Sequence, residues 1–409
     1  MHHTSWQQAR QLLHRAGASQ KASEEEIPLG QALGRILARE ASTLLPVPHY
    51  DSSAMDGYAT AGPPPWQLLA CPAAAEGENL HQRALPLAPG QASPILTGGL
   101  IPAGTDAVIR QEQALLEGSI LSPDPRVFGR GYPAAGADIR RAGEELPAGS
   151  CVLPAGRLLG ARQLAALATL GFDSLTVLAR PTVAIAYTGN EIISSGLPGP
   201  GQVRDAYSLA FPSLITSFGA QLIETCRLPD SPRQLSSWIS SCSADLLLVT
   251  GGSSASSSDW LRPVLLEKKA DYLFESVAVR PGHPALAAYL PQPSSAPRLL
   301  LGLPGNPLAA FSALYSYLPA YLRGRLGLDL ADLPRGRLLT PLGPGRGSDL
   351  RLQPASLEAG PEGLTLSLLP RHQSHMLSSF ASAQALALLP ASGASSGQLL
   401  PYLPLDAPF

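Results

Sequence analysis

Cysteine and charged residues are both scarce in this chain of 409 residues. Its four cysteines lie far apart and none forms a C-x-x-C pair, so we interpret them as buried or incidental thiols of a reducing compartment. Charged residues make up 15% of the chain, against about 25% in an average domain, which suggests that another subunit covers part of the surface. The formal net charge of −2 gives no reason to expect a nucleic-acid partner.

Long apolar runs and the common catalytic motifs are also missing. No run approaches the roughly 18–20 residues of a transmembrane span, and the stretch 1–17 lacks the apolar segment of a secretory signal. We therefore expect a soluble, cytoplasmic protein without a membrane partner. No G-x-S-x-G, H-E-x-x-H, Walker A or G-x-G-x-x-G motif stands in a proper strand–helix setting, so hydrolase, zinc-protease and Rossmann dehydrogenase activities lack support.

The second half of the chain contains three short apolar runs, each followed at once by a polar loop with glycine. The runs and their loops are 182–188 with 189–191, 245–250 with 251–254, and 299–303 with 304–307. Helical pattern lies between or after them, which is typical of buried parallel strands in an α/β domain. The loops would emerge at the carboxyl ends of the strands, where glycines and helix N-termini bind anions. We expect a phosphate- or carboxylate-binding domain here.

Periodicity predicts several helices and one β-rich module. The expected helices are 5–17, 24–40, 158–170 and 308–326. Ser23 with Glu26 fits a capping box for the second of them, and Asp205 is a candidate cap for a further helix over 209–218. From about 60 to 139 the pattern is β-like and often broken by glycine and proline, so this stretch reads as a domain inserted between helical flanks.

Two loops in the first half carry groups that suit ligand binding. Asp51 and Asp56 lie five residues apart and would either hold a divalent cation or cap a turn. Arg140 and Glu145 belong to a charged loop that would either grip an anion or be a solvated cluster. Thr97 begins a Thr-Gly-Gly sequence that is compatible with an ordinary β-turn.

Further candidates lie in the second half. Glu191 and Asp259 follow strand ends and would either face the crevice or cap a helix or turn, and Asp230 has the same ambiguity. Arg280 begins the sequence R-P-G-H-P, which would either bind phosphate or form a surface turn. Ser374 lies beside a histidine in a loop, where a lone histidine is usually structural.

Several of these motifs occur together in an order that is specific to one family. They are DSSAMDGYA (51–59), ILTGGLIPAGTDAVIRQE (95–112), IRRAGEEL (139–146), TGNE (188–191), TGG (250–252), RPGHP (280–284), GLPGNP (302–307) and HQSHMLSSF (372–380). On these motifs the chain resembles the molybdopterin molybdenumtransferase (MoeA) family, which includes the E domain of gephyrin. The resemblance covers nearly the whole chain.

The resemblance implies an α/β multidomain fold with four parts. A three-layer α/β molybdopterin-binding domain with a parallel-rich sheet is expected at 181–330. An elongated helical dimerisation domain (1–50 and 140–180) would flank an inserted β-rich domain (51–139), and a C-terminal β-barrel-like domain would follow at 331–409.

The resemblance also implies an activity, the Mg²⁺-dependent insertion of molybdate into adenylylated molybdopterin with release of AMP. Family members are homodimers whose active site is shared between the α/β domain of one subunit and the β-rich module of the other. No adenylylating domain is visible in these 409 residues, so a second protein should supply the adenylylated pterin in trans. The sequence does not distinguish molybdate from tungstate, nor does it identify the supplying protein.

The resemblance further implies which residues form the site. Asp56, Glu191 and Asp259 would serve the metal and the phosphoanhydride, and Thr97 would contact the substrate across the dimer. Arg280 and Ser374 would contact molybdate. The implied substrate-binding residues are Arg140, Glu145, Asp230, Gly251, Gly252, Ser254, Arg280, Gly305, Asn306 and Ser374.

The chain departs from the family's pattern at Asn190, Tyr207, Ser256, Ser257 and Ser276. An acid becomes the amide of Asn190, and a small polar residue becomes Tyr207, which would clash with the pterin or stack on it. These departures leave three hypotheses: an active transferase, a catalytically weak or inactive paralogue that binds pterin nucleotide, molybdate or a partner protein, and an unrelated nucleotide-binding structural protein.

Overall fold

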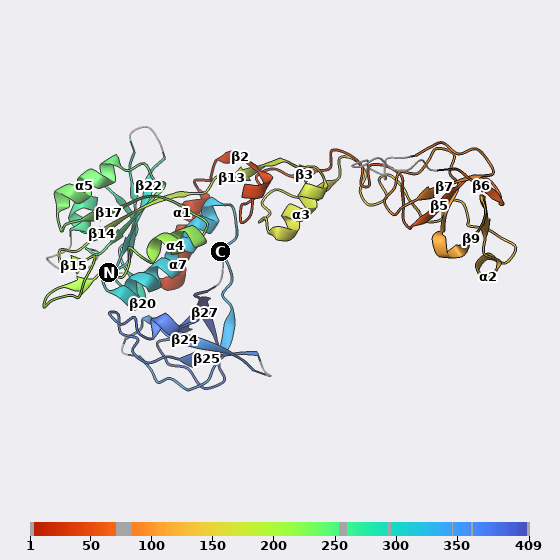
Figure 1. Cartoon of the computed structure of the whole chain (residues 1–409). Coiled ribbons are helices and arrows are strands. Elements are labelled where there is room, and N and C mark those ends of the chain that lie inside the picture. Colours follow the sequence, from red (N-terminus) through yellow and green to blue (C-terminus); the bar gives the residue numbers. More distant parts are fainter. Residues whose placement is uncertain are drawn as a thin grey trace. The chain divides into compact units, whose positions relative to one another are not determined.

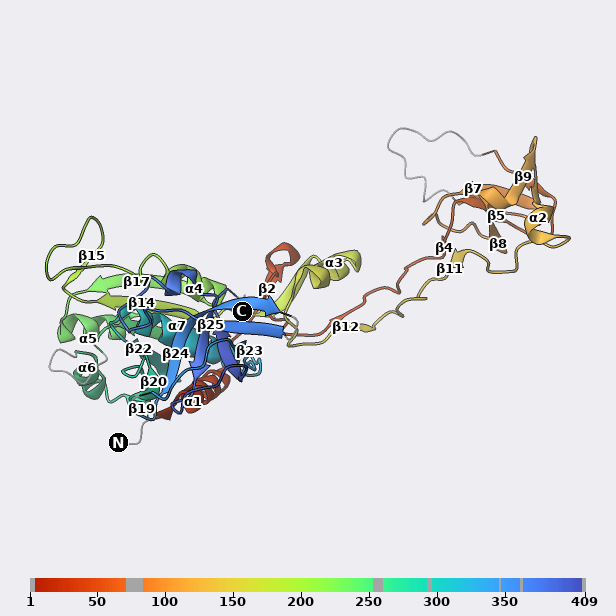
Figure 2. The same ribbon diagram turned by 90° about the horizontal axis from the view of Figure 1, so that it is seen from below.

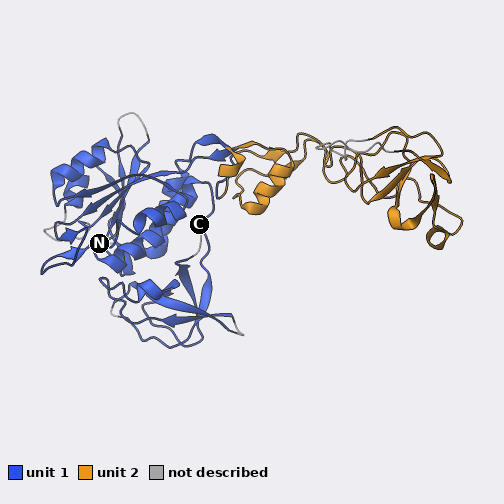
Figure 3. Cartoon of the chain, viewed as in Figure 1, with its two compact units in different colours: residues 1–27, 34–38, 176–409 blue, residues 28–33, 39–175 orange. Residues whose placement is uncertain are grey.

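The computed structural model describes residues 4–70, 84–252, 260–292, 296–345, 347–360 and 363–406. The chain divides into two compact units, one of residues 1–27, 34–38 and 176–409 and the other of residues 28–33 and 39–175 (Figure 3). Within the described ranges, no helix is long and apolar enough to cross a bilayer.

A six-stranded sheet forms the centre of the first unit (Figure 1). In spatial order its strands are β17 (Gln221–Leu228), β14 (Thr182–Thr188), β18 (Leu246–Thr250), β22 (Arg298–Leu303), β21 (Leu286–Leu290) and β19 (Asp271–Phe274). The first four are parallel to one another, β21 runs antiparallel to β22, and β19 runs antiparallel to β21. The prediction of three buried parallel strands is confirmed, with boundaries that differ by at most one residue.

Helices cover both faces of this sheet, which gives the expected three layers (Figure 2). The helices on one face are α1 (Trp6–Ala18), α4 (Phe211–Ser217) and α7 (Pro307–Arg325), and those on the other are α5 (Pro232–Ser241) and α6 (Leu261–Glu267). Alternation along β14 serves both layers, since Val183 and Ile185 pack toward α7 while Ala184 and Ala186 pack toward α5. All four side chains are fully buried.

The C-terminal strands close on themselves. The closed ring runs through β24 (Leu350–Gly360), β25 (Gly363–Leu368), β23 (Arg335–Leu338), β27 (Leu399–Pro404) and β26 (Ala385–Leu389), and β26 pairs again with β24. This is the barrel-like arrangement expected of the segment after 331. Two more strands, β20 (Val277–Arg280) and β1 (Thr4–Ser5), extend the sheet from β24. The β20–β24 pairing brings Arg280 beside the barrel.

The second unit is β-rich, as expected. Its six-stranded sheet has the order β8 (Ala107–Arg110), β5 (Gly57–Thr60), β7 (Gln91–Ile95), β6 (Trp66–Leu68), β10 (Ile120–Pro123) and β9 (Ala114–Glu117). Shorter pairs join β4 (Ser52–Ser53) to β11 (Ile139–Arg140) and β3 (Ala41–Ser42) to β12 (Cys151–Leu153). Its helices are α2 (Pro125–Phe128) and α3 (Ala161–Thr169). The four-domain division and its boundaries stay a prediction.

The helix predicted over 24–40 is wrong. The chain there forms strand β2 (Glu24–Pro28) and a single 3-10 turn at Leu29–Gln31, so the expected capping box does not form. A strand β13 (Ser174–Leu178) also follows α3. Apolar residues at helical spacing suggested the helix, but Pro28 has no backbone N–H to donate, and Gly34 has a positive φ of 72°. These two helix-breaking residues outweigh the helical spacing of the apolar residues.

Two glycines bring helices α1 and α7 into backbone contact. A Cβ atom on Gly17 would lie 2.2 Å from the Tyr321 carbonyl oxygen, and one on Gly324 would lie 2.1 Å from the His14 carbonyl oxygen. Side chains at these positions would push the helices apart, because backbone atoms cannot rotate away. Since α7 begins at the loop after β22, this crossing also fixes the helix that reaches the candidate site.

Gly324→Ala is expected to lower the free energy of unfolding by about 3 kcal/mol, the upper end of the range for overpacking. Urea denaturation followed by circular dichroism measures the change. Gly343→Ala is the matched control, because a Cβ atom at Gly343 meets nothing within 4 Å. Equal stabilities for the two variants would contradict the close crossing of α1 and α7.

Candidate functional site

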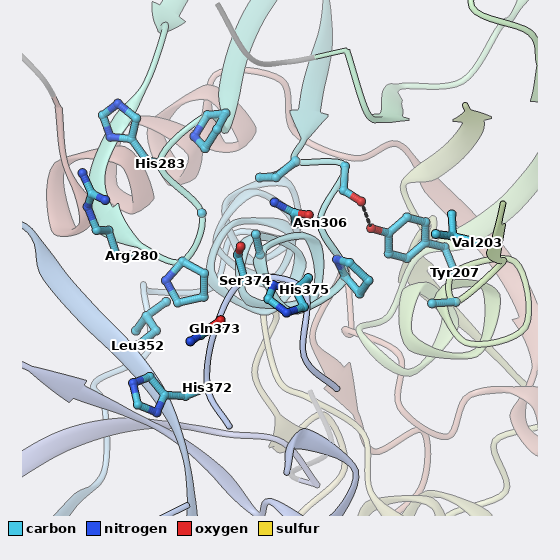
Figure 4. Close-up of a pocket in the computed structure, with 18 of the residues that line it drawn as sticks. Val203, Tyr207, Arg280, His283, Asn306, Leu352, His372, Gln373, Ser374 and His375 are labelled. Carbon is cyan, nitrogen blue, oxygen red and sulfur yellow. Dashed lines mark hydrogen bonds between the residues drawn. The ribbon is translucent and has the colours of Figure 1, made fainter. Parts of the chain in front are cut away.

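A cavity of about 1100 Å³ opens where β14, β18 and β22 end (Figure 4). One wall comes from the loops of the α/β sheet, and the other from the start of the barrel and the loop 372–375. Six of the predicted site residues line it: Glu191, Gly252, Arg280, Gly305, Asn306 and Ser374. The expectation that the strand loops converge on a ligand site is consistent with this geometry.

The first turn of α7 faces this cavity. The chain leaves β22 at Leu303, and α7 starts at Pro307 with Asn306 as its N-cap residue. Proline suits this position because its missing N–H would have no helical partner. The helix has 19 residues, so its N-terminus offers a full helix dipole to an anion. The Ala309 N–H donates to the Ser374 carbonyl oxygen at 3.3 Å, which ties the loop 372–375 to this turn.

Tyr207 holds the loop that contains Gly305 in place. Its side chain is only 5% exposed and packs against Phe211 and Phe311, with ring centroids 4.9 and 6.2 Å away. Its hydroxyl donates to the Gly305 carbonyl oxygen at 2.6 Å (Figure 4). Burial raises the pKa of Tyr207, and the charge of nearby Asp205 adds to this, so the hydroxyl stays protonated. The ring is therefore a core element rather than an exposed stacking platform for the pterin.

Asp205 is a buried turn residue, and the prediction that it caps the helix over 209–218 is wrong. Helix α4 begins only at Phe211, with Ala210 as its N-cap residue. The Asp205 carboxylate instead accepts from the N–H groups of Tyr207 (2.8 Å) and Ser208 (3.1 Å), and it pairs with Arg227 of β17. Burial opposes its ionisation, but these hydrogen bonds and the Arg227 charge lower the pKa of Asp205 on balance.

The departure at Asn190 forms a two-way clamp with Asp230. The Asn190 N–H donates to a carboxylate oxygen of Asp230 at 3.1 Å, and the Asp230 N–H donates to the Asn190 amide oxygen at 3.2 Å. A carboxylate at position 190 would stand close to that of Asp230 and repel it. Asp230 lines a small adjoining pocket of about 10 Å³ together with Gly251 and Gly252, whereas Glu191 is exposed at the main cavity.

The opposite wall is basic. The Arg280 Nε donates to an Asp349 carboxylate oxygen at 2.9 Å, although the Arg280 side chain is 68% exposed. The His283 Nδ1 lies 2.9 Å from the Val277 carbonyl oxygen. Burial lowers the pKa of His372, and the Arg351 charge adds to this, so this imidazole is less readily protonated. Figure 4 shows these side chains on one side of the cavity, with Ser374 between them and α7.

The second unit contains further predicted site residues. The Thr97 N–H donates to an Asp56 carboxylate oxygen at 2.6 Å, so these two predicted residues do lie together. The Asp51 carboxylate is held by the Arg141 guanidinium (2.6 Å) and the Ala142 N–H (2.8 Å), and these bonds lower its pKa. Asp51 is thus a turn residue, and the alternative of a cation site shared with Asp56 is not supported.

Arg140 and Glu145 are exposed in the second unit. Ser254 and Asp259 lie outside the described residues, as do the departures at Ser256 and Ser257. Among the described residues, no three histidine, cysteine, aspartate or glutamate side chains are grouped as a ready metal site. Mg²⁺ needs only one or two carboxylates when substrate phosphates and waters complete its shell, and the exposed Glu191 carboxylate meets that requirement.

Sequence reasoning missed two features of this cavity. Arg204 lines it, and Tyr207 supports its floor. The segment 203–207 follows a Gly/Pro turn and carries no regular pattern, so no signal in the sequence marked Arg204, while Tyr207 was noted only as a departure from the family pattern and not as a support of the cavity. Taken together, these features define an α/β protein with a cavity suited to an anionic ligand at the carboxyl edge of its sheet.

Comparisons with known proteins show to which family this α/β protein belongs. Residues 4–171 match the model of the MoeA N-terminal region (domain I and II), and residues 184–323 match that of a probable molybdopterin binding domain. A molybdopterin molybdenumtransferase from Nostoc sp. is 35% identical over 312 residues, which cover 74% of this chain and 70% of the relative. Another from Haemophilus influenzae is 32% identical over 296 residues, which cover 71% and 70%.

The fold agrees. A crystal structure of a molybdopterin biosynthesis MoeA protein from Pyrococcus horikoshii matches 99% of this chain and 100% of that chain with a TM-score of 0.77, at 22% identity. The chain belongs to the molybdopterin molybdenumtransferase (MoeA) family, as its motifs indicated.

Tyr207→Phe removes only the hydroxyl that holds Gly305. We expect it to lower the free energy of unfolding by about 1 kcal/mol, the usual contribution of one hydrogen bond. Thermal and urea denaturation measure the loss. Tyr289→Phe serves as the control, because Tyr289 lies on β21, away from the residues that line the cavity. An unchanged stability would show that the bond to Gly305 does not hold the loop.

Proposed function

We propose that the chain is a molybdopterin molybdenumtransferase of molybdenum cofactor biosynthesis, which inserts molybdate into adenylylated molybdopterin and releases AMP. The observation that carries this proposal is one cavity with two complementary walls. The wall at α7 suits phosphate, and the wall at Arg280 suits an oxyanion. A volume of about 1100 Å³ lies at the upper end of small-molecule sites and leaves room for a pterin nucleotide beside an oxyanion.

On the wall at α7, called the phosphate wall, backbone groups would bind the phosphate. Gly252 and Gly305 carry no side chain that would keep a ligand from the main chain. The dipole of α7 stabilises negative charge at its first turn, and Tyr207 and Asp205 hold the neighbouring loop in place. A pterin phosphate bound there would stay in one position during the reaction, which is the requirement for an oriented displacement.

The basic wall supports binding of molybdate. Asp349 anchors Arg280 through Nε, and among the described residues the two Nη groups of Arg280 make no other hydrogen bond. They are thus available to two oxygens of an oxyanion. The Ser374 hydroxyl lines the same cavity and can donate to a third. Neither group separates molybdate from tungstate, because the two oxyanions share charge and shape.

Mg²⁺ is part of the proposal, with Glu191, Asp259 and Asp56 as its protein ligands. Glu191 offers an exposed carboxylate on the phosphate wall, and Mg²⁺ prefers oxygen ligands together with substrate phosphates. When bound there, the ion would supply Lewis-acid polarisation of the phosphoanhydride. Glu191 would hold it next to the phosphate that the α7 turn positions.

We also propose a homodimer whose shared site takes Asp56, Thr97, Arg140 and Glu145 from the second copy. Support comes from large exposed apolar side chains in the second unit: Leu33, Leu44 and Leu45 are 57, 76 and 62% exposed. A contact with a second copy would remove these side chains from water. The adenylylated pterin would come from a separate protein, and a cytoplasmic location stays a prediction.

A binding protein without turnover is the second candidate function. The observation in its favour is the clamp between Asn190 and Asp230, which engages Asp230 with a backbone and an amide. Such a protein would keep the cavity and its two walls and would lack the second carboxylate that the family pattern has at position 190.

Molybdate-dependent release of AMP in a single turnover tests the proposal. Purified protein would be mixed with adenylylated molybdopterin and Mg²⁺, with and without molybdate. We expect AMP and molybdenum cofactor only when molybdate is present, and a rate roughly 100-fold lower for Glu191→Gln, because one metal carboxylate is lost. Glu358→Gln, an exposed change on the barrel, should keep the wild-type rate. Binding without AMP release would support the second candidate, and absence of binding would contradict both.

Mixed dimers test the shared site. Asp56→Asn and Glu191→Gln would each keep about 1% of the wild-type rate or less when present alone. A heterodimer of the two variants contains one site with both residues intact, so random mixing should restore about a quarter of the wild-type activity. Light scattering would verify that the variants are dimers. No recovery in a mixture that contains heterodimers would contradict sharing.

A further inference from the structure

Arg204 stands on the phosphate wall of the cavity. It belongs to a short parallel pair formed by β15 (Ile192–Ile193) and β16 (Val203–Arg204), which follows directly on β14 and Glu191. Arg204 is exposed and lines the cavity together with Ile192 and Val203.

Arg204 differs from the other two arginines of the cavity in its contacts. Arg280 pairs with Asp349, and Arg351 donates to the carbonyl oxygens of Gly343 (3.1 Å) and Pro390 (3.3 Å). Arg204 makes no hydrogen bond or ion pair with any residue that the structure describes. A guanidinium keeps its charge at every physiological pH, so its position favours a negatively charged ligand from solution.

Backbone hydrogen bonds fix where Arg204 stands. The Val203 N–H donates to the Glu191 carbonyl oxygen at 2.9 Å, and the Asp205 N–H donates to the Ile193 carbonyl oxygen at 3.0 Å. Two residues further on, the hydroxyl of Tyr207 holds Gly305 at the start of α7. The segment that carries Arg204 is thus tied at one end to Glu191 and β15, and at the other to the loop that contains Gly305.

We propose that Arg204 binds the phosphoanhydride of the adenylylated pterin. This inference rests on the proposed function. The phosphoanhydride has two phosphate groups, so it extends further from the α7 turn than the single phosphate of molybdopterin does. The guanidinium fork matches two phosphate oxygens at once, and Arg204 stands on the wall where the second phosphate would extend from the α7 turn. Arg204 therefore discriminates the adenylylated substrate from molybdopterin, which carries one phosphate.

Two alternative roles of Arg204 would give different binding results. If Arg204 only balances the charge of Glu191, its removal would weaken all anionic ligands to the same small degree. If it contacts a partner protein, its removal would leave the binding of both pterins to the purified protein unchanged. Only a contact with the phosphoanhydride makes the adenylylated form lose more affinity than molybdopterin.

Equilibrium dissociation constants of wild type, Arg204→Gln and Arg204→Lys for adenylylated molybdopterin and for molybdopterin test the proposal. We expect Arg204→Gln to weaken the adenylylated form about 10-fold, the effect of a lost charge-assisted hydrogen bond, and molybdopterin less than about 3-fold. Arg204→Lys should fall between, because it keeps the charge and loses the fork. Arg233→Gln, an exposed change on α5 outside the cavity, should match the wild type.

The outcomes separate this inference from the proposed function. If the wild type does not bind the adenylylated form, the proposed function fails and this inference falls with it. If the wild type binds and Arg204→Gln binds equally well, or loses both pterins equally, the role of Arg204 is overturned while the function stands. Arg204 is exposed, so the melting temperature should not change. A lowered melting temperature together with equal loss of both pterins would show a structural role instead.

Discussion

The candidate site depends on the parallel pairing of β14, β18 and β22. Because neighbouring parallel strands point the same way, the three polar loops that follow them are forced to one edge of the sheet. Glu191, Gly252 and Gly305 are far apart in the sequence and become wall residues of one cavity for this reason alone. The buried strands in turn require helices on both faces, and this fixes the position of α7.

A layer of buried polar contacts then holds the loops at that edge. Asp205 turns the chain so that Tyr207 points its hydroxyl at Gly305, and Arg227 of β17 neutralises the carboxylate that makes this turn. The contact between β20 and the barrel delivers Arg280 to the opposite wall. In the proposed function, phosphate and oxyanion would meet between these two walls, whose own packing does not depend on the ligands.

The sequence predicted the parts of this molecule that local pattern controls. The three strands and their glycine loops were correct because continuous apolar runs have few alternatives in an α/β domain. The helix over 24–40 was wrong since spacing was given more weight than Pro28 and Gly34. The roles of Asp205 and Tyr207 could not be predicted, because each is set by a residue distant in sequence, Arg227 and Gly305. Arg204 was missed because its segment follows a Gly/Pro turn and carries no regular pattern.

Hydrogen exchange with and without adenylylated molybdopterin tests the central claim most directly, since it locates binding without relying on turnover. We expect slower exchange in three separate segments, 188–193, 203–207 and 303–309, with little change in α5 and α6 on the far face of the sheet. Those segments share nothing but the carboxyl edge of the three strands. Protection that is absent from them, or that falls mainly on α5 and α6, would contradict the account.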